Sequence, residues 1–170
     1  MISMIKKQEA NWELYHEFED AVYQNTDLKI KKILDRFDIQ DFQEMPIIYD
    51  LINYKKIRLL KYINSKNIPF TYEEDCGGNS LHAACGAGGS LECVKFLIEN
   101  NLLTDINKKS TKYGDTPLTL AICYGHKDIV DYFKNKFGVS SISLDDLGTI
   151  LDRMKVNYRK QCAKRKGFCF

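Results

Sequence analysis

The chain has 170 residues, of which 44% are hydrophobic and 28% are charged, and its formal net charge is +2. This composition is ordinary for a folded domain and excludes a disordered chain, and the small net charge gives no support for nucleic-acid binding. The opening residues become charged too early for a secretory signal, and no run reaches the roughly 18–20 apolar residues of a membrane span. We therefore expect a cytoplasmic protein with no membrane partner, whose six cysteines are reduced thiols.

The segment 8–38 has the pattern of two helices joined by a turn. Trp12, Tyr15, Phe18 and Val22 recur at helical spacing, which predicts a buried stripe. Asn25 stands at the turn, where asparagine tolerates the left-handed backbone better than most residues. A second apolar run follows, so the segment is expected to form one helix pair.

The segment 39–70 repeats this pattern in MPIIYDLINYKKIRLLKYINSKNIPF. Pro46 and Ile47 open its first helix, and Leu59 lies in the apolar run of its second. Asp50 stands where the first helix needs a small residue, and Tyr54 stands at the turn. The segment therefore predicts a second helix pair with an irregular turn.

The segment 71–107 contains HAACGAGGSLECVKFLIENN, which allows four interpretations. The GAGG stretch could hold a phosphate, but such a loop follows a strand and precedes Lys-Ser or Lys-Thr, and both are missing here. Cys85 and His82 could form a nucleophile pair, although no orienting carboxylate is evident. Cys76, His82, Cys85 and Cys93 could bind zinc, although they lack a tight C-x-x-C spacing. The remaining interpretation is a tight turn between two helices, and the pattern favours it.

The segment 108–138 contains GDTPLTLAICYGHKDIVDYFKNKFG and matches the preceding segment once one extra residue is allowed after Gly88. Thr116 is suited to cap a helix, and Pro117 to occupy its first position, where a missing N–H costs nothing. Ala121 is small enough for neighbouring helices to approach. Gly125 is expected to end the helix in the left-handed conformation, and Gly88 is its counterpart in the preceding segment.

These last two segments resemble the ankyrin repeat, whose signature is G-x-T-P-L-H-x-A-A-x-x-G-H. The resemblance implies an all-α ankyrin-repeat solenoid that forms a single domain over residues 1–170. Its repeats are expected at about 8–38, 39–70, 71–107 and 108–138, with a C-terminal helical cap at 141–166. At the position of His82, the family's histidine hydrogen-bonds to the backbone of the adjoining loop.

The resemblance also implies a protein-binding scaffold that is not an enzyme, needs no cofactor, and has no nucleic-acid or small-molecule partner. The family's contact surface is formed by the loops between repeats and by first-helix positions near each turn. Carried over by position, this surface comprises Ile52, Asn53, Tyr72, Glu73, Glu74, Asp75, Gly86, Ala87, Lys109, Lys112, Tyr113, Asp115, Cys123 and Tyr124. Gly86 and Ala87 are expected to leave a hollow that a partner's side chain could enter.

The residues leave several functions open. A chain that is almost all repeat favours an inhibitor that blocks another protein, such as an immunity protein acting on a cognate toxin. An effector or adaptor subunit bridging two proteins is the alternative, with a second surface around 147–158. The third possibility is a Cys/His metal protein or enzyme. Glu73, Glu74 and Asp75 favour a basic partner, while Lys108, Lys109 and Lys112 indicate a mixed charge pattern instead.

Overall fold

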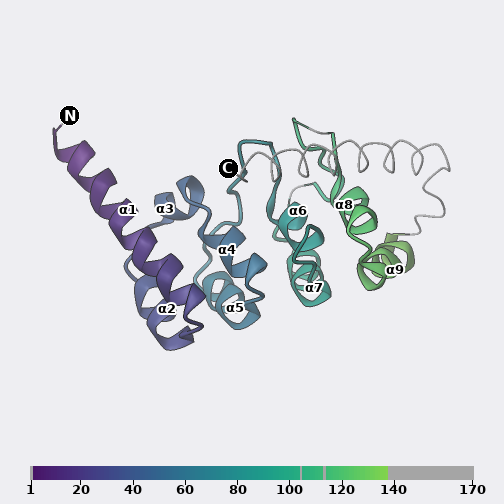
Figure 1. The fold of residues 1–170 in the computed structure, drawn as a ribbon, viewed down its shortest axis with the longest axis horizontal. Helices are drawn as coiled ribbons and strands as arrows, with labels where there is room; N and C mark the ends of the chain where they lie inside the picture. The colour runs from purple at the N-terminus through teal and green to yellow at the C-terminus, as the bar shows by residue number, and fades with distance from the viewer. Residues whose placement is uncertain (1, 104, 113, 138–170) are drawn as a thin grey trace, which may run out of the picture.

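The computed structural model describes residues 2–103, 105–112 and 114–137, and within them it contains nine helices and no strand. The expected all-α architecture is therefore confirmed. Four helix pairs follow one another along the molecule (Figure 1). The expected cap at 141–166 and Tyr113 lie outside the described residues.

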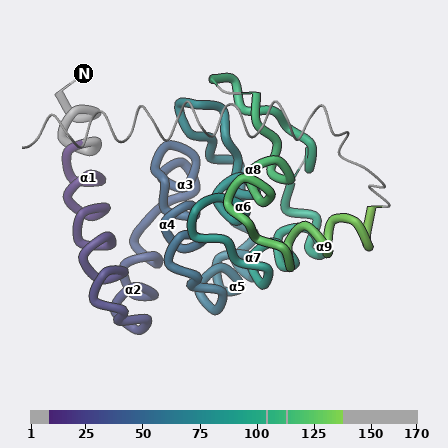
Figure 2. The backbone as a smooth tube through the Cα atoms, turned by 45° about the vertical axis from the view of Figure 1, so that its right-hand side comes forward, coloured from purple at the N-terminus to yellow at the C-terminus, as the bar shows by residue number. Residues whose placement is uncertain are grey.

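Each helix pair contains a first helix, a turn and a second helix. The pairs are α1 (Ile2–Tyr23) with α2 (Asp27–Leu34), α4 (Ile47–Asn53) with α5 (Ile57–Ser65), α6 (Ser80–Cys85) with α7 (Leu91–Glu99), and α8 (Pro117–Cys123) with α9 (Lys127–Phe137). The first helices form one row and the second helices form another (Figures 1 and 2). None of the helices in the described part is both long and apolar enough to cross a membrane.

The fourth pair begins as its sequence predicts. The Thr116 hydroxyl accepts a hydrogen bond from the Thr119 N–H at 3.2 Å, and Pro117 occupies the start of α8. Gly125 ends the turn with φ of +73°. Thr116, Pro117 and Gly125 therefore have the local roles expected of them.

The turns of the first two pairs use residues with a side chain in the left-handed conformation. Asn25 has φ of +58°, as predicted. In the second pair the left-handed residue is Lys55, with φ of +56°, whereas Tyr54 has φ of −90°. The predicted register of this pair is wrong by one residue, because Pro46 is the N-cap and α4 begins only at Ile47.

The glycine-rich segment 86–89 lies between α6 and α7, so the helix–helix turn is confirmed. The expected match between Gly88 and Gly125 fails in backbone conformation, because the positive-φ glycines of the described chain are Gly77, Gly114 and Gly125. The chain leaves α6 through an extended Gly86, with φ of −75° and ψ of −155°. No residue of segment 86–89 has a positive φ, so this turn has no left-handed residue.

Small residues allow the first helices to lie close together. Ala21, Ala84 and Ala121 are each at most 1% exposed, and the surrounding core comes from both rows of helices. Phe18 is fully buried, which confirms it as a core residue of the first pair. Trp12, predicted in the same stripe, is 44% exposed, so that stripe begins at Leu14 and Tyr15 instead.

A short helix, α3 (Ile39–Glu44), connects the first two pairs where the later pairs have an extended loop. The Asp38 carboxylate caps α3 by accepting from the Asp41 N–H at 3.1 Å, and Asp41 accepts from the Asp38 N–H in return. Phe42 is fully buried and anchors the helix to the core. This element was not predicted.

Candidate protein-binding surface

Two extended loops, residues 71–79 and the described residues 105–112 and 114–116, lie next to each other above α6 and α8 in Figure 1. Within the first loop the Glu74 N–H donates to the Gly78 carbonyl at 3.0 Å, and between the loops the Thr111 N–H donates to the Cys76 carbonyl at 2.7 Å. Gly77, with φ of +74°, lies so close to Thr111 that an added Cβ would overlap it. The loops are thus fixed to one another by backbone contacts.

His82 connects α6 to the second of these loops. Its Nε2 lies 3.1 Å from the Asp115 carbonyl oxygen, to which it can only donate, and its Nδ1 lies 3.1 Å from the Asn79 nitrogen and 2.7 Å from the Asn79 Oδ1. Burial lowers the pKa of His82, so the ring stays neutral near pH 7. The hydrogen bond to the adjoining loop backbone, expected of His82, is confirmed.

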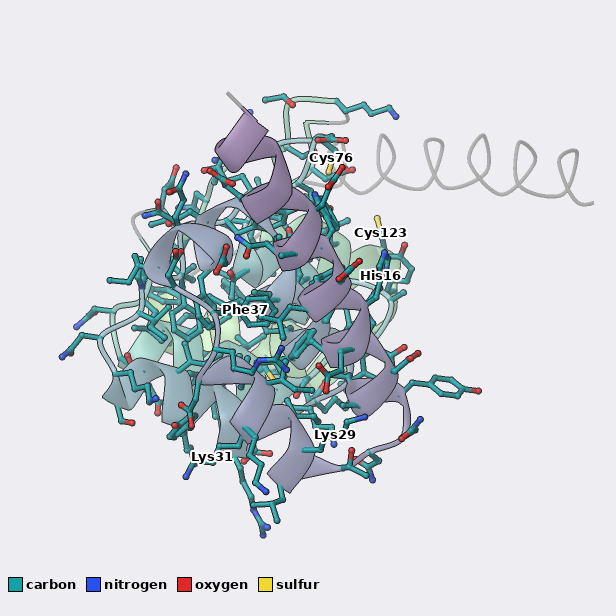
Figure 3. The ribbon with its side chains drawn as sticks, turned by 90° about the vertical axis from the view of Figure 1, so that its left-hand side faces the viewer. His16, Lys29, Lys31, Phe37, Cys76 and Cys123 are labelled. Carbon is teal, nitrogen blue, oxygen red and sulfur yellow. The ribbon has the colours of Figure 1, made fainter. Side chains whose placement is uncertain are left out.

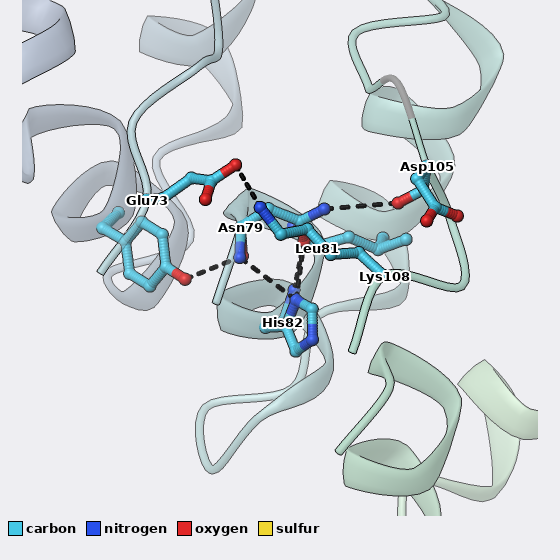
Figure 4. A network of polar contacts seen from close by, with 7 residues as sticks. Glu73, Asn79, Leu81, His82, Asp105 and Lys108 are labelled. Atoms are coloured by element: carbon cyan, nitrogen blue, oxygen red, sulfur yellow. Dashed lines mark hydrogen bonds and ion pairs between the residues drawn. The ribbon is translucent and has the colours of Figure 1, made fainter. Parts of the chain in front are cut away.

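The same network extends through Asn79 (Figure 4). The Asn79 amide donates to the Asp105 carbonyl at 3.3 Å, and the Tyr49 hydroxyl donates to the Asn79 carbonyl at 2.7 Å. Above it, Lys108 forms an ion pair with Glu73. The loop backbone is therefore positioned by side chains from α4, α6 and the loops themselves.

The cysteines considered as nucleophiles or metal ligands lie in surroundings that favour a structural role. Cys85 is fully buried, and burial raises the pKa of its thiol far above the usual range. Burial also raises the pKa of Cys93. Because the thiolate is the reactive form, both thiols are poor nucleophiles. Within the described chain, no three His, Cys, Asp or Glu side chains cluster in a way that could hold a metal ion.

The residues predicted at the ends of the first helices differ in exposure, and Gly86 and Cys123 are only partly exposed. Asn53, Ala87 and Tyr124 are exposed. Ile52 is only 2% exposed and belongs to the core, so its predicted place on the surface is wrong. The one-residue register error caused this, and the exposed residue is Tyr54, at 51%.

Tyr54 could have been found from the spacing of the second helix. In the fourth pair the apolar residues Ile129 and Val130 follow Gly125 by four and five positions. The same spacing back from Leu59 and Leu60 leads to Lys55 as the turn residue. The residue before it, Tyr54, is then the counterpart of Tyr124.

The predicted loop residues fall into two groups. Glu73, Glu74, Asp75, Lys109 and Lys112 are exposed, as expected of a contact surface.

Tyr72 and Asp115 are only partly exposed. The Tyr72 ring packs edge-on against Tyr49, with centroids 5.7 Å apart and planes at 75°, which gives it a packing role as well. The Asp115 carbonyl accepts from His82, so the backbone of Asp115 is part of the structural network.

A side chain from the fourth pair occupies part of the hollow predicted at Gly86 and Ala87. His126 Nε2 lies 2.7 Å from the Gly86 carbonyl. A Cβ on Gly89 would overlap the His126 ring, which explains why a glycine stands there. The Tyr124 ring stacks on His126 at 6.3 Å with planes 21° apart, so this exposed tyrosine is held in place before any partner binds.

Charge is separated between the two rows within residues 9–90. Residues 9–24, 38–54 and 71–90 carry twelve Asp and Glu and no Lys or Arg. Residues 27–37 and 55–66, which include α2 and α5, carry nine Lys and Arg and two Asp. Figure 3 shows His16 of α1 and Cys123 of α8 on one side, with Lys29 and Lys31 of α2 at the lower end of the molecule.

Asp50 belongs to the acidic segment 38–54, and its side chain extends from α4 toward α1. The Tyr15 hydroxyl donates to its Oδ2 at 2.6 Å. Burial raises the pKa of Asp50 to about 6, and the neighbouring Glu19 carboxylate adds to the shift. The carboxylate is ionised at pH 7, so this part of the surface is negative.

These features define a solenoid of helix–turn–helix units whose loops and first-helix ends carry exposed residues. The family profile described as ankyrin repeats (3 copies) matches residues 47–143, which include α4 to α9. An ankyrin repeat protein of Rickettsia bellii (strain RML369-C) is similar, with 65% identity over 104 residues that cover 61% of this chain and 85% of that protein. The chain belongs to the ankyrin-repeat family, whose repeats are protein–protein interaction modules.

Proposed function

We propose that this chain is a non-catalytic binding protein that blocks a cognate protein by covering part of its surface. The contact surface is formed by the first-helix ends, Tyr23, Asn53, Tyr54, Ala87 and Tyr124, together with the exposed loop residues. The observation that carries the proposal is the repeated placement of an exposed tyrosine at the end of a first helix. Tyr23 is 81% exposed, Tyr54 51% and Tyr124 52%.

The chemistry of this row suits protein recognition. Tyrosine supplies a large apolar ring and a polar hydroxyl, and it is enriched among residues that dominate binding energy. Tyr124 loses little freedom on binding, because its ring already stacks on His126.

The acidic character of the first-helix row supports a partner with a basic surface. Residues 9–24, 38–54 and 71–90 carry twelve Asp and Glu and no Lys or Arg. Two of these carboxylates pair with cations from outside the segments, Glu17 with Arg36 and Glu73 with Lys108. Electrostatic complementarity of this kind raises association rates and selects partners.

The test compares the proteins that bind the native chain with the proteins that bind two variants of it. Proteins held by the native chain should be lost with Tyr54→Ala and Tyr124→Ala together, because two exposed anchors are removed. Their binding should persist with Lys95→Ala, an exposed residue of α7 in the other row. A partner that binds all three equally would place the contact surface elsewhere.

The inhibitory role needs a second measurement on the purified partner. If the chain acts by occlusion, adding it in slight excess should abolish the partner's activity, and the double tyrosine variant should fail to do so. A bacterial toxin is the first class to test, since an immunity protein needs only a binding surface and a relative occurs in a bacterium. Full partner activity in the complex would favour the adaptor role.

A further inference from the structure

The second helices of the first two pairs carry a surplus of positive charge that the proposed protein-binding surface does not use. With their turns, they hold the basic residues Lys29, Lys31, Lys32, Arg36, Lys55, Lys56, Arg58, Lys61 and Lys66, and the acidic residues Asp27 and Asp35. The corresponding helices α7 and α9 have balanced charge, with four Lys against Glu92, Glu99, Asp128 and Asp131. The surplus is therefore confined to one half of the solenoid.

Part of this charge is already neutralised within the fold. Lys56, only 8% exposed, pairs with Asp27 at 2.6 Å, and Arg36 pairs with Glu17 at 2.8 Å. Lys66 pairs with Asp35. Within α2 and α5, five exposed cations form no ion pair with the described residues, and these are Lys29, Lys31, Lys32, Arg58 and Lys61.

Helix geometry places several of these cations on one outward side. In α2 the buried residues are Ile30, Ile33 and Leu34, so Leu28 and Lys32, four positions apart, lie on the opposite face.

In α5 the buried residues are Leu59, Leu60 and Ile63, so Arg58 and Lys61 lie on the outward face of that helix.

A cluster around Tyr62 joins the two helices into one surface. The Tyr62 hydroxyl donates to Asp35, and the ammonium groups of Lys31 and Lys66 lie 4.3 Å and 4.7 Å from the centre of its ring. We call this arrangement the lysine–tyrosine clasp. It places Lys31 of α2 against α5, so the cations of both helices form a continuous patch.

We propose that this outer patch of α2 and α5 binds the surface of an anionic lipid bilayer. Four features carry the proposal: the cations outnumber the anions, they lie on adjacent helices, they face away from the acidic row, and an exposed leucine stands among them. Leu28 is 72% exposed beside Lys29 and Lys32. Clustered lysines are attracted to anionic headgroups, and an apolar side chain beside them can enter the interface.

The composition of the patch favours a bilayer over a nucleic acid. Four of these five cations are lysines, which act as point charges rather than as bidentate ligands of phosphate. The aromatic ring of the patch, Tyr62, has two lysines against it, Lys31 and Lys66, so it is not available for stacking on bases.

The experiment measures co-sedimentation of the full chain with vesicles of phosphatidylcholine alone or containing about 30% phosphatidylserine. We expect binding only to the anionic vesicles, and its loss in roughly 0.5 M salt, where screening is strong. Each cation removed should lower the partition coefficient about fivefold, so Lys32→Gln, Arg58→Gln and Lys61→Gln together should lower it about a hundredfold. Leu28→Ala should lower it roughly fivefold through lost insertion.

The matched control is Lys95→Gln with Lys134→Gln, which removes two exposed cations from α7 and α9 in the same row. This variant should bind anionic vesicles like the native chain, and circular dichroism should show that all variants are folded. Equal loss in the control, or no binding of the native chain to anionic vesicles, would overturn the proposal. So would binding of labelled single-stranded RNA without binding to vesicles. Partner capture through the tyrosine row is measured separately and does not depend on this result.

Discussion

The junction between the second and third helix pairs is built differently from the junctions on either side of it. At the first junction Lys56, at the start of the second helix of its pair, reaches back to Asn25 and Asp27 of the first pair. At the last junction His126 occupies the same position and reaches back to Gly86. At the middle junction the corresponding residue is Ser90, whose short side chain accepts a hydrogen bond from the Cys93 N–H of its own helix.

The outer row shows the same difference. The lysine–tyrosine clasp of the first junction recurs at the last one, where Lys95 and Lys136 lie 5.7 Å and 5.5 Å from the Tyr132 ring centre. The Tyr132 hydroxyl donates to Glu99 at 3.3 Å.

At the middle junction the corresponding positions hold Lys61, Ser65, Phe96 and Asn100. Ser65 and Asn100 each donate to a carbonyl of their own helix, Tyr62 and Phe96 respectively, so neither forms a clasp across the junction.

The comparison shows that the first and last junctions share two kinds of side-chain contact, within α1–α5 and within α6–α9, whereas the middle junction has other contacts. That junction depends on packing between α4 and α6, and on Tyr49, which is 4% exposed and hydrogen-bonds to Asn79. In a linear stack, stability is approximately a sum of unit and interface contributions. Because Ser65, Ser90 and Asn100 bond within their own helices instead of across the middle interface, we expect cooperativity to fail there first.

The largest expected effect comes from Tyr49→Ala. The change removes a buried ring and a buried hydrogen bond at the middle junction, and it should cost about 3–4 kcal/mol of unfolding free energy. Urea unfolding should then show two separate transitions. Trp12, the single tryptophan, lies in α1 and reports by fluorescence on the first half, while circular dichroism reports on all helices.

The control is Tyr132→Ala at the last junction, where the ring is partly exposed and Lys95 and Glu99 belong to the same half. It should cost less and leave the fluorescence and circular dichroism transitions coincident. Coincident transitions in Tyr49→Ala would show that the middle junction is as strongly coupled as the others.

The turns of the two halves should respond in opposite directions. Gly125→Val should cost about 2–3 kcal/mol, because a β-branched residue resists the left-handed backbone there. No atom lies within 4 Å of a Cβ at Gly125, so the cost would come from the backbone alone.

In the first half, Lys55 adopts the same conformation with a side chain, and Lys55→Gly should therefore gain about 0.5 kcal/mol. Thermal unfolding measures both variants. An unchanged melting temperature in Gly125→Val would contradict the assignment of the turn.

Asp50 gives the first half its own dependence on pH. The pKa of Asp50 is raised to about 6, above its ordinary value of 3.8, so the folded state keeps this proton after the unfolded state has lost it. Its contribution to stability is therefore present at low pH, falls as the pH rises from about 4 to 6, and stays constant above that.

Asp50→Asn should remove this fall and gain about 2 kcal/mol at pH 7, a figure reduced for the partial exposure of the carboxyl group. The measurement is urea unfolding of both proteins between pH 4 and 7. The difference between them isolates Asp50 from the other carboxylates. A difference that does not change with pH would mean that the carboxyl group titrates at its ordinary value in the fold.

Sequence patterns were sufficient where the backbone has a special local requirement. The residue type itself predicts the conformation at three positions, and the structure agrees: Thr116 at the N-cap, Pro117 at the helix start and Gly125 at the turn. His82 was likewise predictable, because its family position fixes its partner.

The errors arose where the local signal was absent. Lys55 adopts a left-handed backbone conformation that its residue type does not predict. The predicted register of the second pair was therefore shifted by one residue, which placed Ile52 on the surface and missed Tyr54.

Contacts between helix pairs could not be predicted from the sequence for a different reason. The clasp joins Lys31 to Tyr62, 31 positions apart, and the contact forms only if the helices turn the right faces toward each other. The reach of His126 to Gly86 depends on an extended backbone at Gly86 that only the folded chain defines.

A small gain in stability is also expected from completing a clasp at the middle junction. Lys61 and Phe96 already supply a cation and a ring at two of the clasp positions. Ser65→Asp with Asn100→Lys would add an acid on α5 and a second cation next to the end of α7. Both sites are exposed, so the gain in unfolding free energy should be about 0.5–1 kcal/mol and should decrease in high salt.

Introduced into Tyr49→Ala, the same two changes should bring the separated fluorescence and circular dichroism transitions closer together. The matched control is the reversed pair, Ser65→Lys with Asn100→Asp, which keeps the same total charge and introduces the same two residue types. It places a second lysine four positions after Lys61 on the same helix, where two like charges repel. Equal gains from both pairs would mean that the effect is one of general surface charge, whereas a gain limited to the first would assign it to the clasp geometry.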